Sequence, residues 1–241
     1  NTLFLLEENH YPLPYLKQEE GELLSKIKGG IKGEKNGILK VSFFGDFRAV
    51  AEEEGKPLSF RTRKGAELFA YMIKKNGRPV GRKQLLSALW NDELPDNAVT
   101  MLHNMLYNLR KELSAYRLEN LIEYKDKEYR IHMELVETDM DEIDRLCRMA
   151  DQDDRGELIK HQERFRSYWG RYLEDVDGLW TMEDREYYDT RFMKGCSVLA
   201  REAAKEERFG DAALFYKNAM LVNGYSEEWE AELLKCYGMT G

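Results

Sequence analysis

The sequence has no long apolar run and few cysteines, and each shortage excludes a class of protein. No stretch approaches the roughly 18 consecutive apolar residues of a membrane span, and no signal peptide is visible, although a chain that starts at Asn1 can lack its true N-terminus. Cys147, Cys196 and Cys236 are odd in number and far apart, as expected of reduced thiols and not of a disulfide framework. We therefore expect a cytoplasmic protein without membrane contacts.

Patterns of catalytic and ligand-binding residues are also missing. The segment from Gly77 to Lys83 has neither the spacing nor the Lys-Ser/Thr ending of a phosphate-binding loop. The histidines lack metal-ligand spacing to one another or to the cysteines: His10, His103, His132 and His161. The 45 acidic residues are so numerous that Glu183, Asp184 and Glu186 are interpreted as a solvated helix face. We expect no enzyme, no cofactor, no metal and no small-molecule substrate.

The net charge of −8 is unevenly distributed. Residues 38–133 hold 17 Lys and Arg against 13 Asp and Glu, a net of +4, whereas residues 134–241 hold 15 against 26, a net of −11. A basic segment beside an acidic one indicates two domains with different partners. Residues 1–37 contain Gly29, Gly30, Gly33 and Gly37 with lysines between them, which is typical of a linker or the tail of an upstream domain.

From Ile38 the pattern predicts short strands and then helices. Strands are expected at 39–44, 47–51 and 58–60, helices at 63–76 and 83–90, and a hairpin with strands at 121–124 and 128–132. Pro79-Val80 is too short for more than a bridge. Between the second helix and the hairpin lies the stretch from Pro95 to Leu113, with Asp96 or Asn97 as its cap. The apolar residues of this third helix form one stripe: Val99, Leu102, Leu106, Leu109 and Leu113.

Several motifs in this order carry a resemblance. They are V-S-F-F-G-D-F from Val41, G-R-P-V-G-R-K-Q-L-L-S-A-L-W from Gly77, then P-D-N-A and N-L-R-K-E-L. Together they resemble the winged-helix DNA-binding domain of OmpR-type response regulators, and most of all the version in SARP-type regulators. The resemblance spans Leu39 to His132 and implies a winged helix-turn-helix at 38–133 that binds double-stranded DNA.

In such domains the third helix lies in the major groove, and the resemblance assigns DNA contacts by position. The residues expected to contact base edges or nearby phosphates are Thr100, His103, Asn104, Tyr107 and Asn108. The residues expected to contact phosphates are Arg63, Lys64, Arg82, Lys83, Arg110 and Lys111. The hairpin would bring Lys125, Lys127 or Arg130 to the minor groove. Other interpretations stay open: Arg63 and Lys64 can simply begin a helix, Arg110 can pair with Glu67 or Glu112, and Tyr107 can pack on the neighbouring domain.

The second half is predicted to be helical. Met140, Ile143, Leu146 and Cys147 fit one helix, and Leu158, Phe165 and Trp169 fit another. Further helices are expected at 182–207 and from 225. Arg208 to Met220 resembles half a tetratricopeptide unit, with Ala212 and Ala219 as its small residues and Phe209 as its aromatic, although Glu207 replaces the usual opening glycine.

The segments Y-W-G-R-Y-L-E-D from Tyr168 and Trp180, Glu183, Arg185 resemble the bacterial transcriptional activator domain that follows the winged helix in SARP-type regulators. The predicted fold is an α+β OmpR-like winged helix followed by an all-α, TPR-like domain at 138–241. The resemblance implies a bacterial transcription regulator, either SARP-type or the output half of a two-component response regulator. Its helical domain would contact RNA polymerase or a second protomer.

The sequence also departs from that pattern. SARP-type recognition helices tend to have arginine where this chain has Thr100, His103 and Asn108, and the hairpin turn reads K-D-K-E in place of glycine and arginine. Because arginine is the usual reader of guanine, this change favours A·T-rich or shape-based sites. It also keeps open an alternative function, a protein-interaction scaffold whose winged helix no longer binds DNA.

Overall fold

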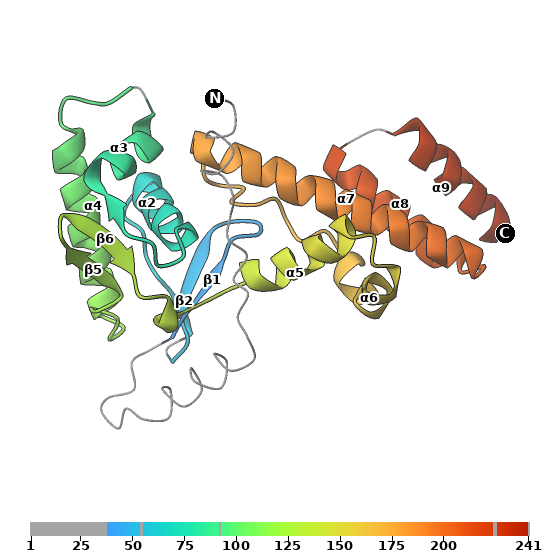
Figure 1. Ribbon diagram of the computed structural model, residues 1–241, viewed down its shortest axis with the longest axis horizontal. Coiled ribbons are helices and arrows are strands. Elements are labelled where there is room, and N and C mark those ends of the chain that lie inside the picture. Colours follow the sequence, from blue (N-terminus) through green and yellow to red (C-terminus); the bar gives the residue numbers. More distant parts are fainter. Residues whose placement is uncertain (1–37, 54, 92, 224–225, 241) are drawn as a thin grey trace, which may run out of the picture. The chain divides into compact units, whose positions relative to one another are not determined.

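The computed structural model describes residues 38–53, 55–91, 93–223 and 226–240. Residues 1–37, and with them the predicted linker, lie outside the described part. The elements follow one another as predicted, strands first, then helices and a hairpin, then helices to the end (Figure 1).

The first sheet has the strand order β3-β2-β1-β7. Strands β1 (Leu39–Ser42) and β2 (Arg48–Ala51) are antiparallel, with Leu39 opposite Ala51. The third strand, β3, lies at Lys56–Pro57 and not at 58–60, and proline is tolerated there because β3 is an edge strand. The sequence missed β7 (Val136–Thr138), which pairs in parallel with β1, Leu39 opposite Val136.

The second sheet has the order β4-β6-β5 and contains the hairpin. Strands β5 (Ile122–Lys125) and β6 (Glu128–Ile131) are joined by two residues, Asp126 and Lys127, which both have positive φ. Two such residues make the type I′ turn that suits the twist of a hairpin. The predicted bridge at Pro79-Val80 is the strand β4 (Val80–Gly81), which pairs with β6.

The helices of the first half are α2 (Arg63–Lys74), α3 (Arg82–Trp90) and α4 (Ala98–Ser114). Helix α2 begins where the Thr62 side chain accepts a hydrogen bond from the Gly65 amide at 3.0 Å. Helix α4 has Asn97 at its N-cap position, without a capping hydrogen bond from that side chain. The core between these helices and the two sheets contains fully buried Leu39, Phe69, Leu85 and Leu102.

A one-turn 3-10 helix at Met133–Leu135 leads into β7, and the second half after β7 consists of helices. They are α5 (Met140–Asp151), α6 (Arg155–Lys160), α7 (Met182–Lys205), α8 (Phe209–Asn223) and α9 (Glu227–Thr240), with 3-10 turns at Gln162–Phe165 and Leu179–Thr181. The prediction of one helix through Leu158, Phe165 and Trp169 is wrong, because α6 ends at Lys160 and Phe165 belongs to the first of these 3-10 turns.

Helix α8 runs back along the C-terminal part of α7, and α9 packs on α8 (Figure 1). Ala203, Ala212 and Ala219 are fully buried, so small residues permit the close approach that the tetratricopeptide resemblance predicted. Glu207, at the position of the usual glycine, has a φ of 58°. The backbone at position 207 therefore has the left-handed conformation that favours glycine, although the residue is glutamate.

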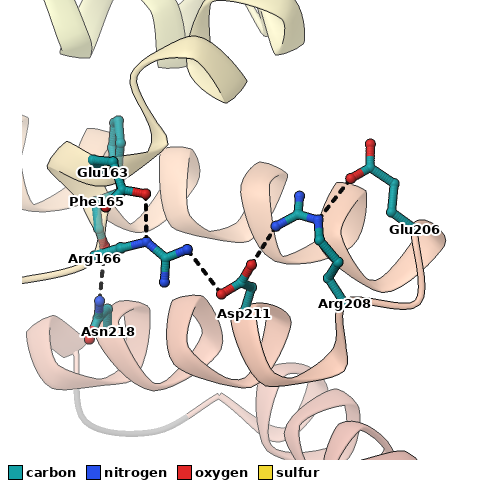
Figure 2. A network of polar contacts seen from close by, with 7 residues as sticks. All are labelled: Glu163, Phe165, Arg166, Glu206, Arg208, Asp211 and Asn218. Carbon is teal, nitrogen blue, oxygen red and sulfur yellow. Dashed lines mark hydrogen bonds and ion pairs between the residues drawn. The ribbon is translucent and has the colours of Figure 1, made fainter.

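A polar network connects the turn at Gln162–Phe165 to α8 (Figure 2). The Arg166 guanidinium contacts Glu163 at 2.8 Å and Asp211 at 3.0 Å, and Arg208 contacts Asp211 at 2.5 Å and Glu206 at 2.9 Å. Basic and acidic groups thus alternate along the chain of contacts. Next to it, the buried Asn218 amide donates to the Phe165 carbonyl oxygen at 2.9 Å.

The two halves meet at the turn after β1. The Leu173 amide donates to Phe43 O at 2.6 Å, and the Gly45 amide donates to Arg171 O at 2.9 Å. The Asp139 carboxylate accepts from the Phe43 amide at 2.9 Å, and the Asp175 carboxylate accepts from the Phe47 amide at 2.8 Å. The motif from Tyr168 to Asp175 is therefore bound to the turn after β1, where Phe44 and Tyr172 form an isolated bridge.

Helix α7 secures this junction. The Arg185 guanidinium donates to the carbonyl oxygens of Tyr172, Leu173 and Val176. Asp184, which the sequence placed on a solvated face, forms an ion pair with Lys74 of α2 instead. The prediction is wrong for Asp184, whose partner is 110 positions away in the sequence, whereas Glu183 and Glu186 are exposed as predicted.

Candidate nucleic-acid interface

Helix α4 has one buried face and one exposed face. The buried residues are Ala98, Leu102, Met105, Leu106, Leu109 and Leu113. The predicted stripe is right except at Val99, which is 40% exposed, while Met105, left out of the stripe, is 8% exposed. Positions 98, 102, 105 and 109 keep the helical spacing, so the stripe is rotated away from Val99 by part of a turn.

The opposite face of α4 is open to solvent. It carries Thr100, His103, Asn104, Tyr107 and Lys111, all exposed, and Tyr107 keeps 67% of its surface. The alternative in which Tyr107 packs on the helical domain is therefore wrong. None of these side chains is acidic, and Lys111 lies in the last turn, where a cation complements the helix dipole.

The two acidic residues considered as partners of Arg110 are held by other groups. Glu112 accepts a hydrogen bond from the Ser59 amide at 2.8 Å. Glu67 is 4% exposed and contacts the Lys64 ammonium at 2.8 Å. Both carboxylates that the sequence offered as partners for Arg110 are thus engaged elsewhere, and the exposed face of α4 keeps its neutral and basic character.

Arg110 instead contacts the hairpin. Its guanidinium donates to the Ile122 carbonyl oxygen at 3.4 Å and lies 6.0 Å from the centre of the Tyr129 ring. The Tyr129 and Tyr124 rings are 4.6 Å apart, and burial raises the pKa of Tyr129 above its ordinary value. These contacts fix the hairpin against α4, with Tyr124 54% exposed beside it.

The other predicted contact residues differ in how free they are. Exposed side chains are Arg63, Arg82, Lys83, Lys125, Lys127 and Arg130, whereas Lys64, Asn108 and Arg110 are half-buried. Arg130 contacts Glu123 at 2.6 Å, and Lys64 donates to Leu89 O at 2.5 Å as well as contacting Glu67. Lys64 therefore mainly stabilises the fold, and the charge of Arg130 is partly neutralised by Glu123.

Sequence reasoning missed Arg61. This exposed residue donates from its guanidinium to the Asn108 amide oxygen at 3.3 Å. It lines a shallow groove beside α4 together with Phe60, Thr62, Asn104 and Asn108. The signal that reveals it is the run R-T-R-K from Arg61 to Lys64, which leads into α2.

The part of the chain that the structure describes also bears on metal binding, membrane insertion and thiol chemistry. No group of three or more His, Cys, Asp or Glu side chains there could hold a metal ion. No helix among those residues is long and apolar enough to cross a bilayer. Cys147 and Cys196 are buried, and burial raises the pKa of both thiols.

Residues 55–128 match the family model described as "Transcriptional regulatory protein, C terminal". Among solved structures, the chain is similar to Mycobacterium tuberculosis EmbR, solved in complex with a low affinity phosphopeptide, with 17% identity and a TM-score of 0.58. The similarity covers 85% of this chain and 55% of that chain, so this chain spans about half of the neighbour. No curated protein matches the sequence.

These comparisons confirm the fold that the sequence predicted. The family match identifies an OmpR-like winged helix at residues 55–128, and the similarity to EmbR over 85% of this chain extends the shared fold beyond that domain. At 17% identity the neighbour carries the fold alone. The roles of individual residues on α4 and on the hairpin stay predictions.

Proposed function

We propose that this chain is a sequence-specific DNA-binding bacterial transcription regulator that acts in the cytoplasm, as a SARP-type regulator or the output part of a response regulator. The observation that carries the proposal is the exposed, carboxylate-free face of α4. A helix with a buried apolar back and a hydrogen-bonding front fits the major groove, where each base pair presents its own pattern of donors and acceptors. The family match over residues 55–128 supports the same function.

Exposed cations on neighbouring elements would hold the DNA backbone. Arg61 precedes α2 and Arg63 begins it, Arg82 and Lys83 open α3, Lys125 ends β5, and Lys127 lies in the hairpin turn. Phosphate contacts of this kind set the register of a protein on the duplex and supply most of the non-specific affinity. Specificity would then come from α4.

The acidic helical domain, which we place at residues 138–241, would contact a protein. Paired helices such as α7, α8 and α9 offer extended surfaces for binding other proteins and not catalytic pockets. A second protomer or RNA polymerase is the partner that fits a regulator. EmbR was solved with a phosphopeptide, so that structural neighbour binds a peptide.

Retention on duplex DNA at low salt tests the proposal with the full chain. We expect binding at about 0.05 M salt that is lost near 0.2 M, because neutralising phosphates releases counterions. A genome-wide pull-down of bound DNA would then identify the sites. No retention at low salt would overturn the proposal and leave the protein-interaction scaffold as the function.

A further inference from the structure

We infer that the first half of α4 reads A·T base pairs, with Asn104 pairing with adenine and the methyl groups of Val99 and Thr100 contacting thymine. The inference rests on the proposed function, because it assigns the base preference of the same surface. It follows from which side chains of α4 are free and which are already held.

Two of the polar side chains predicted to reach DNA are engaged within the fold. Asn108 accepts the hydrogen bond from Arg61, and Arg110 is directed at the hairpin by Ile122 O and the Tyr129 ring. Asn104 is exposed, and its side chain takes part in none of the hydrogen bonds among the described residues. Asn104 is therefore the amide of α4 with both its donor and its acceptor available to a base.

The chemistry of this helix excludes the usual reading of guanine. Bidentate recognition of guanine needs an arginine or lysine, and α4 contains only Arg110 and Lys111, both in its second half. Residues at the N-terminal end of a recognition helix are the ones that contact base edges. An asparagine there pairs with the N6 and N7 atoms of adenine.

Val99 supplies the second observation. This residue is 40% exposed in the first turn of α4, at a position where the apolar pattern predicts burial. Thr100 is exposed beside it and adds another methyl group. Apolar contact with the C5 methyl of thymine is the complement of an adenine-reading asparagine. Thr100 and Asn104 are four residues apart on one face, about 6 Å along the axis, which lets them reach neighbouring base pairs.

The experiment selects sites for the full chain from random duplex DNA and then replaces single bases in the selected site. We expect an A·T-rich consensus. Replacing the contacted adenine by 7-deazaadenine, which lacks N7, should weaken binding of the native chain by about tenfold. The Asn104→Ala variant should bind the modified and the unmodified site with the same affinity. Replacing thymidine by deoxyuridine, which lacks the methyl group, should weaken the native chain severalfold and not the double variant Val99→Ala, Thr100→Ser.

Asn108→Ala is the matched control, because Arg61 already holds the Asn108 amide. The affinity of this variant for DNA can change, but its base preference should equal that of the native chain. Unchanged melting temperatures would show that the variants fold. A consensus built on G·C pairs, or an Asn104→Ala variant that keeps the 7-deazaadenine penalty, would overturn the inference while leaving the proposed function intact. Enrichment of no DNA would instead overturn the proposed function.

Discussion

Lys74 of α2 and Asp184 of α7 form an ion pair in which the side chains keep 15% and 18% of their accessible surface. The Lys74 ammonium also donates to Trp180 O at 3.4 Å and lies 5.2 Å from the centre of the Trp180 ring. A winged-helix element is thereby tied to the longest helix of the second half. This contact has consequences for stability that depend on pH.

We predict that Lys74→Met destabilises the chain by about 1–3 kcal/mol at pH 8, because it leaves the Asp184 carboxylate poorly solvated and without its cation. Burial raises the pKa of Asp184 above its ordinary value, and Lys74 opposes that rise. A carboxyl with a raised folded-state pKa binds its proton more tightly when folded, so stability is regained as the pH falls through that pKa. Urea unfolding at pH 8 and pH 5 should show a smaller loss at pH 5.

Arg78→Met is the control for this prediction, because Arg78 is an exposed cation four positions away. Its effect should stay within about 0.5 kcal/mol at both pH values. A Lys74→Met loss that is the same at pH 5 and pH 8 would argue against a role for Asp184 ionisation.

A second prediction concerns Gly170, which has a φ of 90° where Phe44 and Tyr172 form a bridge. A Cβ atom there would lie 2.6 Å from the Gly45 nitrogen, which is backbone and cannot rotate away. We expect Gly170→Ala to cost roughly 2–4 kcal/mol, the sum of the left-handed penalty and the overpacking. The melting temperature of the full chain measures it.

Gly45→Ala separates the two causes. Gly45 also has a positive φ, of 84°, but a Cβ atom there would meet nothing within 4 Å. Its cost should therefore be only the conformational part, about 1–2 kcal/mol. Equal losses for the two variants would mean that the close approach of the two segments does not contribute.

These contacts show why the sequence predicted some features and not others. Helix α4 and the hairpin were predictable because their apolar spacing and turn residues are local signals. Strand β7 was not, because three residues give no period and their partner Leu39 lies about a hundred positions earlier. The exposure of Val99 and the engagement of Arg110 also depend on which neighbouring elements cover α4, which the spacing of residues within the helix does not determine.

The third prediction concerns Asn218, which is 6% exposed and donates to Phe165 O at 2.9 Å (Figure 2). Asn218→Ala should destabilise the chain by about 1–3 kcal/mol, because the Phe165 carbonyl oxygen loses a buried partner. The exposed neighbour Lys217→Ala serves as the control. Chemical unfolding that gives both variants the same free energy would show that this hydrogen bond contributes nothing.

The last prediction tests the assigned DNA-binding surface by charge. Lys83 opens α3 and Lys111 ends the exposed face of α4. If both hold phosphates, the double variant Lys83→Glu, Lys111→Glu should weaken binding by at least about tenfold and reduce the slope of log K against log salt by about 2. The slope counts phosphate contacts, so it separates lost contacts from a general loss of fold.

The matched control is Arg145→Glu with Lys217→Glu, two exposed cations on α5 and α8. It changes the net charge by the same amount but leaves the winged helix untouched. Long-range repulsion alone would lower the affinity of both double variants and leave their slopes close to that of the native chain, because no phosphate contact would be lost. An unchanged slope for Lys83→Glu, Lys111→Glu on a selected site would therefore mean that the DNA lies against a different face of the winged helix.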